Sequence, residues 1–143
     1  MFTESTWGLS PLFDYPQVTF EPQNLVLACP DCNGFLYKHD KNTVITTNSK
    51  YKDWEFSIVH PYFDDPSDYY DYKEEQIIIR IKNGISPKMI SKAKYTCYDL
   101  FDLNSEYMLT MRQALSGRKA LDPDGSELDR LIQEALDYKK TWT

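Results

Sequence analysis

Two cysteines separated by two residues are the clearest chemical signal in the chain. Cys29 and Cys32 frame the tetrapeptide Cys-Pro-Asp-Cys, and thiolates at this spacing can bind one tetrahedral Zn²⁺ ion. A structural zinc site needs four ligands, so two more must come from elsewhere. The protein candidates are His39, His60 and Cys97, together with several aspartates. The pattern indicates half of a structural zinc site, completed by such side chains or by a second chain; the alternative is a pair of unmetallated thiols at a strand end.

The cysteine pair lies within a longer pattern. The matching stretches are Tyr15-Pro16, Asn24-Leu25-Val26-Leu27-Ala28-Cys29, Cys32-Asn33, Lys38, and His60-Pro61-Tyr62-Phe63-Asp64-Asp65. A later piece runs from Ala93-Lys94-Tyr95-Thr96 through Leu103-Asn104 to Leu109 and Arg112, and it is similar to the helical segment that follows these motifs in one nuclease branch. Together these stretches resemble the HNH (ββα-metal, or His-Me finger) endonucleases, in the cysteine-containing branch found among bacterial anti-phage nuclease subunits.

The resemblance implies roles for individual residues. Asn24 matches the asparagine that fixes the turn between two strands and orients the catalytic histidine. Asn33 matches the ligand of a catalytic divalent metal, Mg²⁺ or another ion. Cys29 and Cys32 match one half of a structural zinc site, and His60 matches a histidine that is either structural or a metal ligand.

The sequence also departs from the family at its catalytic centre. In that family an Asp-His or Glu-His dipeptide stands a few residues before the Tyr-Pro element and supplies the general base. Here the corresponding segment runs from Trp7 to Asp14, and Gly8 stands about where the histidine is expected. The first cysteine pair of the family is not found in this sequence. A positioned base typically contributes about 10²–10⁴-fold to hydrolysis. We therefore expect a degenerate or partial HNH endonuclease, linked to DNA targeting in bacterial or phage defence or counter-defence. The alternative is a catalytically silent acidic module that binds protein or mimics DNA.

Charge is distributed unevenly along the chain. The net charge is −6, and residues 1–75 carry 13 acidic and 5 basic side chains. This sign argues against non-specific coating of nucleic acid, which depends on lysine and arginine. Residues 76–98 contain five basic residues and no acid, and these are the candidate nucleic-acid contacts: Arg80, Lys82, Lys88, Lys92 and Lys94. The alternative is an ordinary solvated face.

The expected partners follow from these patterns. They are DNA, a protein or second subunit that completes the site, or a second copy in a homodimer. No apolar stretch approaches the roughly 18 residues of a membrane span, and the first residues lack the features of a signal peptide. We expect no membrane partner and a cytoplasmic location.

The length of 143 residues and the 41% hydrophobic content predict a single domain over residues 1–143. Its class is predicted as α+β: an N-terminal arm (1–16), an HNH-like finger with short antiparallel strands (17–82), and a mainly helical segment (83–143). Strands are predicted at 18–20 and 25–28, forming a hairpin, and at 43–47, 52–60 and 76–82. Asn104 and Ser126 are the predicted N-caps of two C-terminal helices. The predicted inward residues of these helices are Met108, Leu109, Met111, Leu115, Leu128, Leu131, Ile132, Ala135 and Leu136.

Overall fold

The computed structural model describes residues 7–8, 14–26, 32, 37–39, 41–71, 77–117 and 122–142. The chain divides into two compact units, Met1–Pro66 and Ser67–Thr143. Helices and short antiparallel strands occur together, and the C-terminal segment is helical, so the predicted α+β class is confirmed. The assignment of all 143 residues to one domain stays a prediction.

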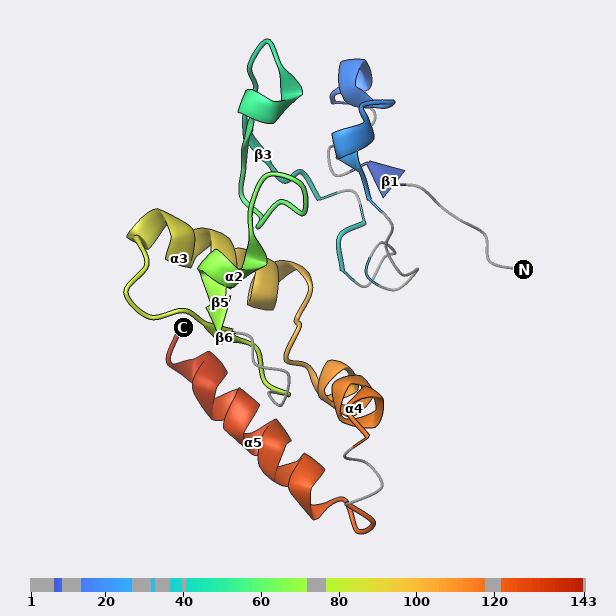
Figure 1. Cartoon of the computed structure of the whole chain (residues 1–143), viewed down its shortest axis with the longest axis vertical. Coiled ribbons are helices and arrows are strands. Elements are labelled where there is room, and N and C mark those ends of the chain that lie inside the picture. The colour runs from blue at the N-terminus through green and yellow to red at the C-terminus, as the bar shows by residue number, and fades with distance from the viewer. Residues whose placement is uncertain are drawn as a thin grey trace, which may run out of the picture. The chain divides into compact units, whose positions relative to one another are not determined.

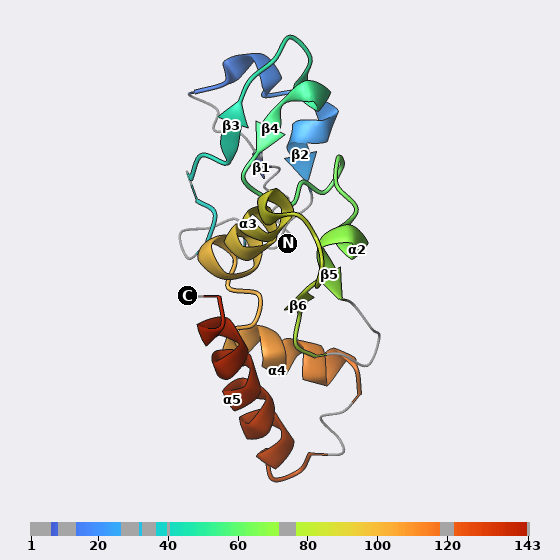
Figure 2. The same ribbon diagram turned by 90° about the vertical axis from the view of Figure 1, so that its left-hand side faces the viewer.

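The described residues of unit 1, Met1–Pro66, form two separate pairs of antiparallel strands. Strand β1 (Trp7–Gly8) pairs with β2 (Leu25–Val26), and β3 (Val44–Thr46) pairs with β4 (Glu55–Phe56). Figure 2 shows β3 and β4 side by side. The predicted strand at 43–47 is therefore confirmed in its central residues.

The segment between β1 and β2 differs from the prediction. Val18 lies in a 3₁₀ turn, η1 (Pro16–Val18), and a second turn, η2 (Pro22–Asn24), follows it. Each turn begins with a proline, whose fixed φ favours a helical first turn. The predicted hairpin between 18–20 and 25–28 is therefore wrong, because β2 pairs with β1 instead.

An alternating pattern builds the core of unit 1. Trp54, Phe56, Ile58 and His60 are buried, whereas the residues between them are exposed or half-buried. Successive side chains of an extended segment point to opposite faces, so every second residue meets the core. Only Glu55–Phe56 joins a ladder, and the 3₁₀ turn η3 (Tyr51–Asp53) precedes it. Of the strand predicted over 52–60, only Glu55–Phe56 is paired in a sheet, and the first residues form a 3₁₀ turn.

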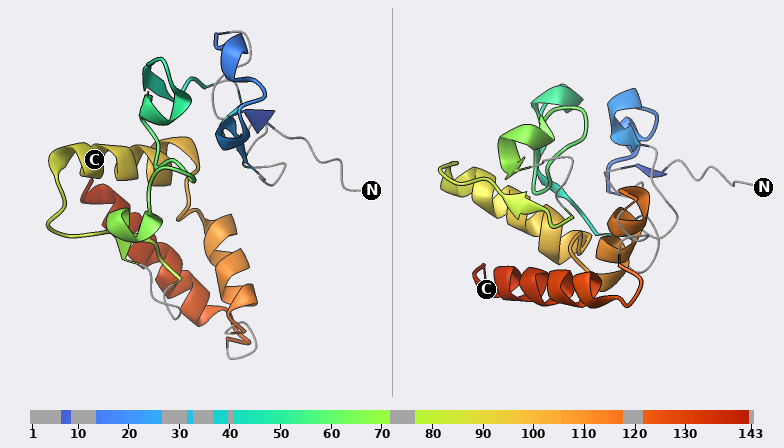
Figure 3. Two further views of the ribbon diagram at one scale, coloured as in Figure 1. Left: turned by 45° about the horizontal axis from the view of Figure 1, so that its top comes forward. Right: turned by 60° about the horizontal axis from the view of Figure 1, so that its bottom comes forward.

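Unit 2, Ser67–Thr143, begins with a strand pair and continues as helices. The short helix α2 (Pro66–Tyr69) leads into β5 (Tyr70–Asp71), which pairs with β6 (Arg80–Ile81). The predicted strand over 76–82 is therefore only two residues long where it is described. Helix α3 (Pro87–Lys94), with Ser86 as its N-cap, continues without a break into the π-helix η4 (Tyr95–Leu100) (Figure 3).

The last two helices of unit 2 are α4 (Glu106–Leu115) and α5 (Ser126–Lys140), and they lie next to each other (Figures 1 and 2). Their N-caps are Ser105 and Gly125, each one residue away from the predicted cap. Gly125 has φ of 77°, a left-handed conformation that glycine adopts without strain.

The core of unit 2 joins these helices to the chain before β6. Its buried members are Ile77, Ile78, Leu109, Leu131 and Ala135, with Leu128 and Ile132 packed against them. Within the described ranges, no helix has the length and apolar character needed to cross a membrane.

Candidate functional site

The strand pair β1–β2 is where the resemblance would place the general base. Gly8 lies in β1 directly opposite Leu25 of β2, and Trp7 lies opposite Val26. Glycine carries no side chain that could accept a proton. The register position at which the base is expected therefore holds no acid or base.

Asn24 lies at the end of η2, immediately before β2, and is 1% exposed. Its side-chain nitrogen donates a hydrogen bond to the carbonyl oxygen of Val18 over 3.0 Å. Its side-chain oxygen accepts a hydrogen bond from the hydroxyl of Tyr51 over 3.0 Å. The amide thus fixes the turn from Val18 to Asn24 and ties it to the segment that carries Tyr51.

His60 is completely buried and sits among aromatic rings. Its ring stacks on Phe63 with a centroid distance of 4.2 Å and lies 4.5 Å from the ring centroid of Phe56. The backbone N–H of Tyr62 donates to Nδ1 over 3.2 Å, and Nε2 lies 3.5 Å from the hydroxyl oxygen of Tyr51.

These contacts assign the tautomer of His60. An N–H donor at Nδ1 requires a lone pair there, so the neutral ring carries its proton on Nε2. Nε2–H then donates to Tyr51, whose hydroxyl donates to Asn24, and Asn24 donates to Val18. The result is a directional chain of hydrogen bonds through the core of unit 1. In this arrangement neither ring nitrogen of His60 offers a lone pair to a metal ion.

The carboxylate loop after His60 has a structural contact of its own. Asp64 accepts a hydrogen bond from the backbone N–H of His60 over 2.6 Å, and its own N–H donates to the His60 carbonyl over 2.9 Å. Tyr62 donates from its hydroxyl to the carbonyl oxygen of Leu25 over 3.0 Å. The His60-Pro61-Tyr62-Phe63-Asp64 segment therefore closes a turn and holds it near β2.

The residues predicted to bind metal are only partly described; Cys29 and Cys32 were expected to bind zinc, and Asn33 a catalytic divalent ion. Cys29 and Asn33 lie outside the described residues, whereas Cys32 is helical and half-buried, and its carbonyl accepts a hydrogen bond from Lys38 N–H. His39 is half-buried in a turn, with φ of 44°. Across the described positions, no three side chains of histidine, cysteine, aspartate or glutamate are grouped as a metal site would require. The zinc site stays a prediction.

The five basic residues predicted to contact nucleic acid belong to unit 2, and their surroundings differ. Arg80 forms an ion pair with Glu134, and its guanidinium lies 4.8 Å from the centroid of the Tyr138 ring. Lys82 donates to the carbonyl of Ser67 over 3.1 Å. Arg80 and Lys82 are therefore engaged within the unit.

The other three basic residues lie on helix α3. Lys88 is exposed, while Lys92 and Lys94 are half-buried. The ammonium of Lys92 lies 5.7 Å from the centroid of the Tyr69 ring. Lys88 and Lys92 are four residues apart and so share one side of the helix.

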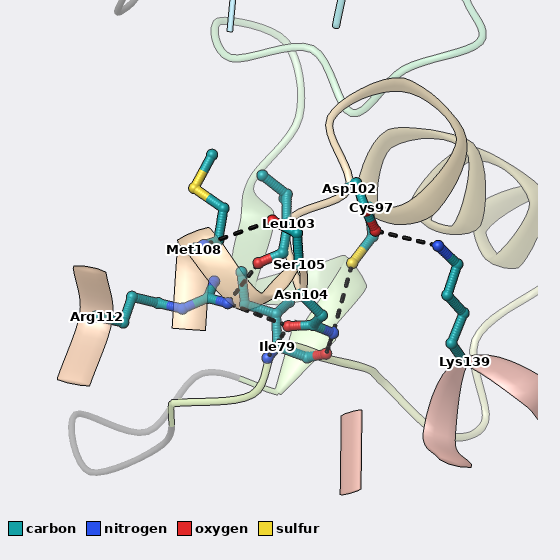
Figure 4. Close-up of polar contacts among 9 residues, drawn as sticks. All are labelled: Ile79, Cys97, Asp102, Leu103, Asn104, Ser105, Met108, Arg112 and Lys139. Carbon is teal, nitrogen blue, oxygen red and sulfur yellow. Dashed lines mark hydrogen bonds and ion pairs between the residues drawn. The ribbon is translucent and has the colours of Figure 1, made fainter. Parts of the chain in front are cut away.

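A second buried polar network, in unit 2, was not expected from the sequence (Figure 4). Asn104 is 8% exposed, and its oxygen accepts hydrogen bonds from Ile79 N–H over 2.9 Å and from Arg112 over 3.2 Å. Its nitrogen donates to the Ile79 carbonyl over 2.8 Å and lies 4.0 Å from the sulfur of Cys97. Arg112 also donates to the carbonyl oxygen of Leu103. One asparagine thus pairs both main-chain groups of Ile79 as a neighbouring strand would.

Cys97 lies beside this network in the π-helix η4 and is fully buried. Burial raises the pKa of its thiol to about 12, with the Arg112 charge opposing the rise. The thiol is therefore protonated and unreactive at neutral pH, because the thiolate is the nucleophilic and metal-binding form. Cys97 therefore has the properties of a buried packing residue.

Unit 1 also has an open cleft of about 490 Å³ beside the buried network. Its lining is mostly polar side chains and also includes the buried rings of Tyr51 and Trp54. The lining residues are Gln17, Val18, Glu21, Gln23, Thr47, Asn48, Ser49, Lys50, Tyr51, Lys52 and Trp54. The sequence offered no signal for this cleft, because its walls come from two segments about 30 residues apart.

Comparison with protein-family models, with curated proteins and with solved structures finds no match to this chain.

Proposed function

We propose that this protein is a degenerate HNH-endonuclease-like module that acts by binding a macromolecule rather than by hydrolysing a phosphodiester. The observation that carries this proposal is the state of His60. Both of its ring nitrogens are engaged in the core, and it has no exposed surface. A general base must reach the attacking water directly or through one bridging water.

Three features of unit 1 support the HNH-like part of the proposal. Strands β1 and β2 are antiparallel, Asn24 directly precedes β2, and the helical residue Cys32 follows it. Two strands followed by a helical residue agree with the order that the sequence resemblance implies. Gly8, which pairs with Leu25, is the residue that the resemblance aligns approximately with the missing base.

The binding partner that the charges favour is a protein with a basic surface, within a system that targets DNA. Residues 1–66 carry nine acidic and four basic side chains. Such an excess attracts a basic surface and repels phosphate. In unit 2, Arg80 already has Glu134 as its counter-charge. An acidic face could also substitute for DNA on a basic partner.

A metal-dependent nicking assay on supercoiled plasmid tests the absence of catalysis. We expect no cleavage above the metal-free control with Mg²⁺, Mn²⁺ or Ni²⁺. Metal-dependent cleavage that is abolished by a chelator and by Asn33→Ala would overturn the proposal, because it would show a working catalytic centre. His39→Ala tests the other histidine as a general base, because His39 is half-buried whereas His60 has no exposed surface.

A salt titration of DNA binding tests the choice of partner. Contacts to phosphates give an affinity that falls steeply as salt concentration rises. We expect weak binding without that dependence, both in the native chain and in Lys88→Ala/Lys92→Ala. Tight binding with a steep slope that the double variant flattens would show instead that helix α3 contacts DNA.

A further inference from the structure

The connection between β6 and helix α3 carries the dipeptide Asn83-Gly84 (Figure 1). Both residues are exposed, and Gly84 has φ of 77°. The connection is held at its two ends, where the Lys82 N–H donates to the Tyr69 carbonyl over 2.8 Å and Ser86 caps α3. Asn83 and Gly84 therefore lie on a short exposed turn between two fixed segments.

Two groups of this turn that can react with each other have no partner among the described residues. No described group accepts a hydrogen bond from the Gly84 N–H, and none is bonded to the side-chain amide of Asn83. Apart from its chain neighbours, no atom lies within 4 Å of the position that a β-carbon of Gly84 would occupy. The Gly84 nitrogen is therefore uncrowded, and glycine gives the backbone the widest freedom to rotate toward the preceding side chain.

We propose that Asn83 is a site of spontaneous deamidation in the folded protein. The Gly84 nitrogen loses its proton to solvent and bonds to the side-chain carbonyl carbon of Asn83, whose amide nitrogen takes up a proton and leaves as ammonia. The product is a cyclic succinimide. Water then opens the ring at one of its two carbonyl carbons, which gives either aspartate or isoaspartate at this position. The reaction consumes water and needs no oxidant, metal or enzyme.

Other asparagines of the chain show what protects against this reaction. Asn104 is 8% exposed, and its amide is bonded to both main-chain groups of Ile79. Asn42 is exposed, but its side-chain oxygen accepts the Val44 N–H over 2.9 Å, and the next residue, Thr43, is completely buried and β-branched. Exposure, a free amide and a following glycine occur together at Asn83.

The reaction changes the charge of a segment that otherwise contains no acid. Residues 76–98 carry five basic side chains and no acidic one, so deamidation adds the first carboxylate there. The isoaspartate product also lengthens the main chain of the turn by one carbon atom. Because the reacting dipeptide lies outside β6 and α3, the hydrogen bonds of both elements are retained. The modification is therefore confined to the charge and length of the turn.

Peptide mass spectrometry tests the proposal on the full chain, incubated in mildly alkaline buffer without denaturant. We expect the mass gain of deamidation to accumulate on the Asn83 peptide at least about tenfold faster than on the Asn42 and Asn104 peptides, a difference of about 1.4 kcal/mol in activation free energy. The product should elute as two species of equal mass, aspartate and isoaspartate. A gain at Asn83 that is less than tenfold faster than at Asn42 would overturn the proposal.

A parallel incubation in urea separates the effect of the fold from that of the dipeptide. Asn104 should react faster in urea, because unfolding breaks its bonds to Ile79. The rate at Asn83 should change by less than about tenfold, and a larger rise would refute the proposal because it would show that the folded turn protects the amide. Asn83→Gln is the matched control and should abolish the gain, since glutamine would have to form a larger ring. Asn33-Gly34 lies outside the described residues, and its peptide is followed separately.

Discussion

Replacing Asn104 by alanine should destabilise unit 2 more than any change at an exposed amide. Asn104 supplies the hydrogen-bond partners of both the N–H and the C=O of Ile79, and it accepts a bond from Arg112. Alanine removes all three contacts. Because Ile79 precedes β6 and Asn104 precedes α4, the substitution also separates two segments 25 residues apart in sequence.

The magnitude follows from the two main-chain groups of Ile79. Removing one partner of a buried hydrogen bond costs about 1–3 kcal/mol. Ile79 is half-buried, so water can replace part of what is lost. We therefore expect the free energy of unfolding to fall by about 2–4 kcal/mol, a large share of the roughly 5–15 kcal/mol of a typical domain.

Urea unfolding followed by circular dichroism at 222 nm measures this loss, because α3, α4 and α5 all belong to unit 2. With a slope of about 1–3 kcal/mol per molar urea, the midpoint should fall by about 0.7–4 M. Asn104→Asp keeps the acceptor for Ile79 N–H but loses the donor to its C=O, so its loss should be intermediate. Gln133→Ala is the exposed control and should change stability by less than about 0.5 kcal/mol. If Asn104→Ala behaves like this control, the hydrogen-bonding argument is refuted.

Three further predictions concern the buried polar groups and one helix terminus. Tyr51→Phe removes the hydroxyl between Asn24 and His60, so unit 1 should lose about 1–2 kcal/mol in urea unfolding followed by tryptophan fluorescence; an unchanged midpoint would contradict the chain of hydrogen bonds. Asp122 accepts hydrogen bonds from two N–H groups at the start of α5, first of all from Glu127, and these lower its pKa below the ordinary value of 3.8. The ionised Asp122 carboxylate therefore stabilises the fold above about pH 4, and this stabilisation is lost as pH falls through the folded pKa. Between about pH 5 and pH 2, Asp122→Asn should therefore lose less stability than the native chain. Equal losses would count against this role of Asp122. Because burial raises the pKa of the Cys97 thiol to about 12, iodoacetamide should label it slowly in the native chain at about pH 8, and faster as urea unfolds unit 2. Mass spectrometry of the Cys97 peptide measures the rate, and rapid native labelling would be the opposite result.

The parts of the fold that local patterns determine were predictable from the sequence. The alternation from Trp54 to His60 predicted a face that meets the core, and every second residue there is buried. The β-branched stretch around Val44 is a strand, as expected. Both patterns depend on the two-residue period of extended backbone, which needs no knowledge of the partner segment.

Pairing between distant segments was not predictable in the same way. The strand Leu25–Val26 pairs with Trp7–Gly8, because Pro16 and Pro22 turn the nearer candidate into 3₁₀ structure. A two-residue strand carries too little pattern to specify its own partner.

Side-chain roles in unit 2 show a similar limit. Asn104 and Ser105 are adjacent, and both residue types are good N-caps. Ser105 is the N-cap of α4, whereas Asn104 is buried and bonded to the main chain of Ile79. Met111 and Leu115 were predicted to face inward and are exposed, because α5 packs on the side of α4 that carries Leu109. Helical spacing shows that a face is apolar but not what covers it.

The hydrogen-bond network in unit 1 also opposes a role of His60 as a general base. To act as a base at Nδ1, His60 would have to release the N–H of Tyr62 from that atom. To act at Nε2, its ring proton would first have to move to Nδ1, which would turn an N–H toward that of Tyr62 and leave the Tyr51 hydroxyl without its donor. Either change leaves a polar group without its partner inside a cluster that also contains Phe56 and Phe63. Unpaired polar groups in such a setting cost about 1–3 kcal/mol each. Proton transfer at His60 would therefore be opposed by the packing that stabilises unit 1, as the proposed non-catalytic role requires.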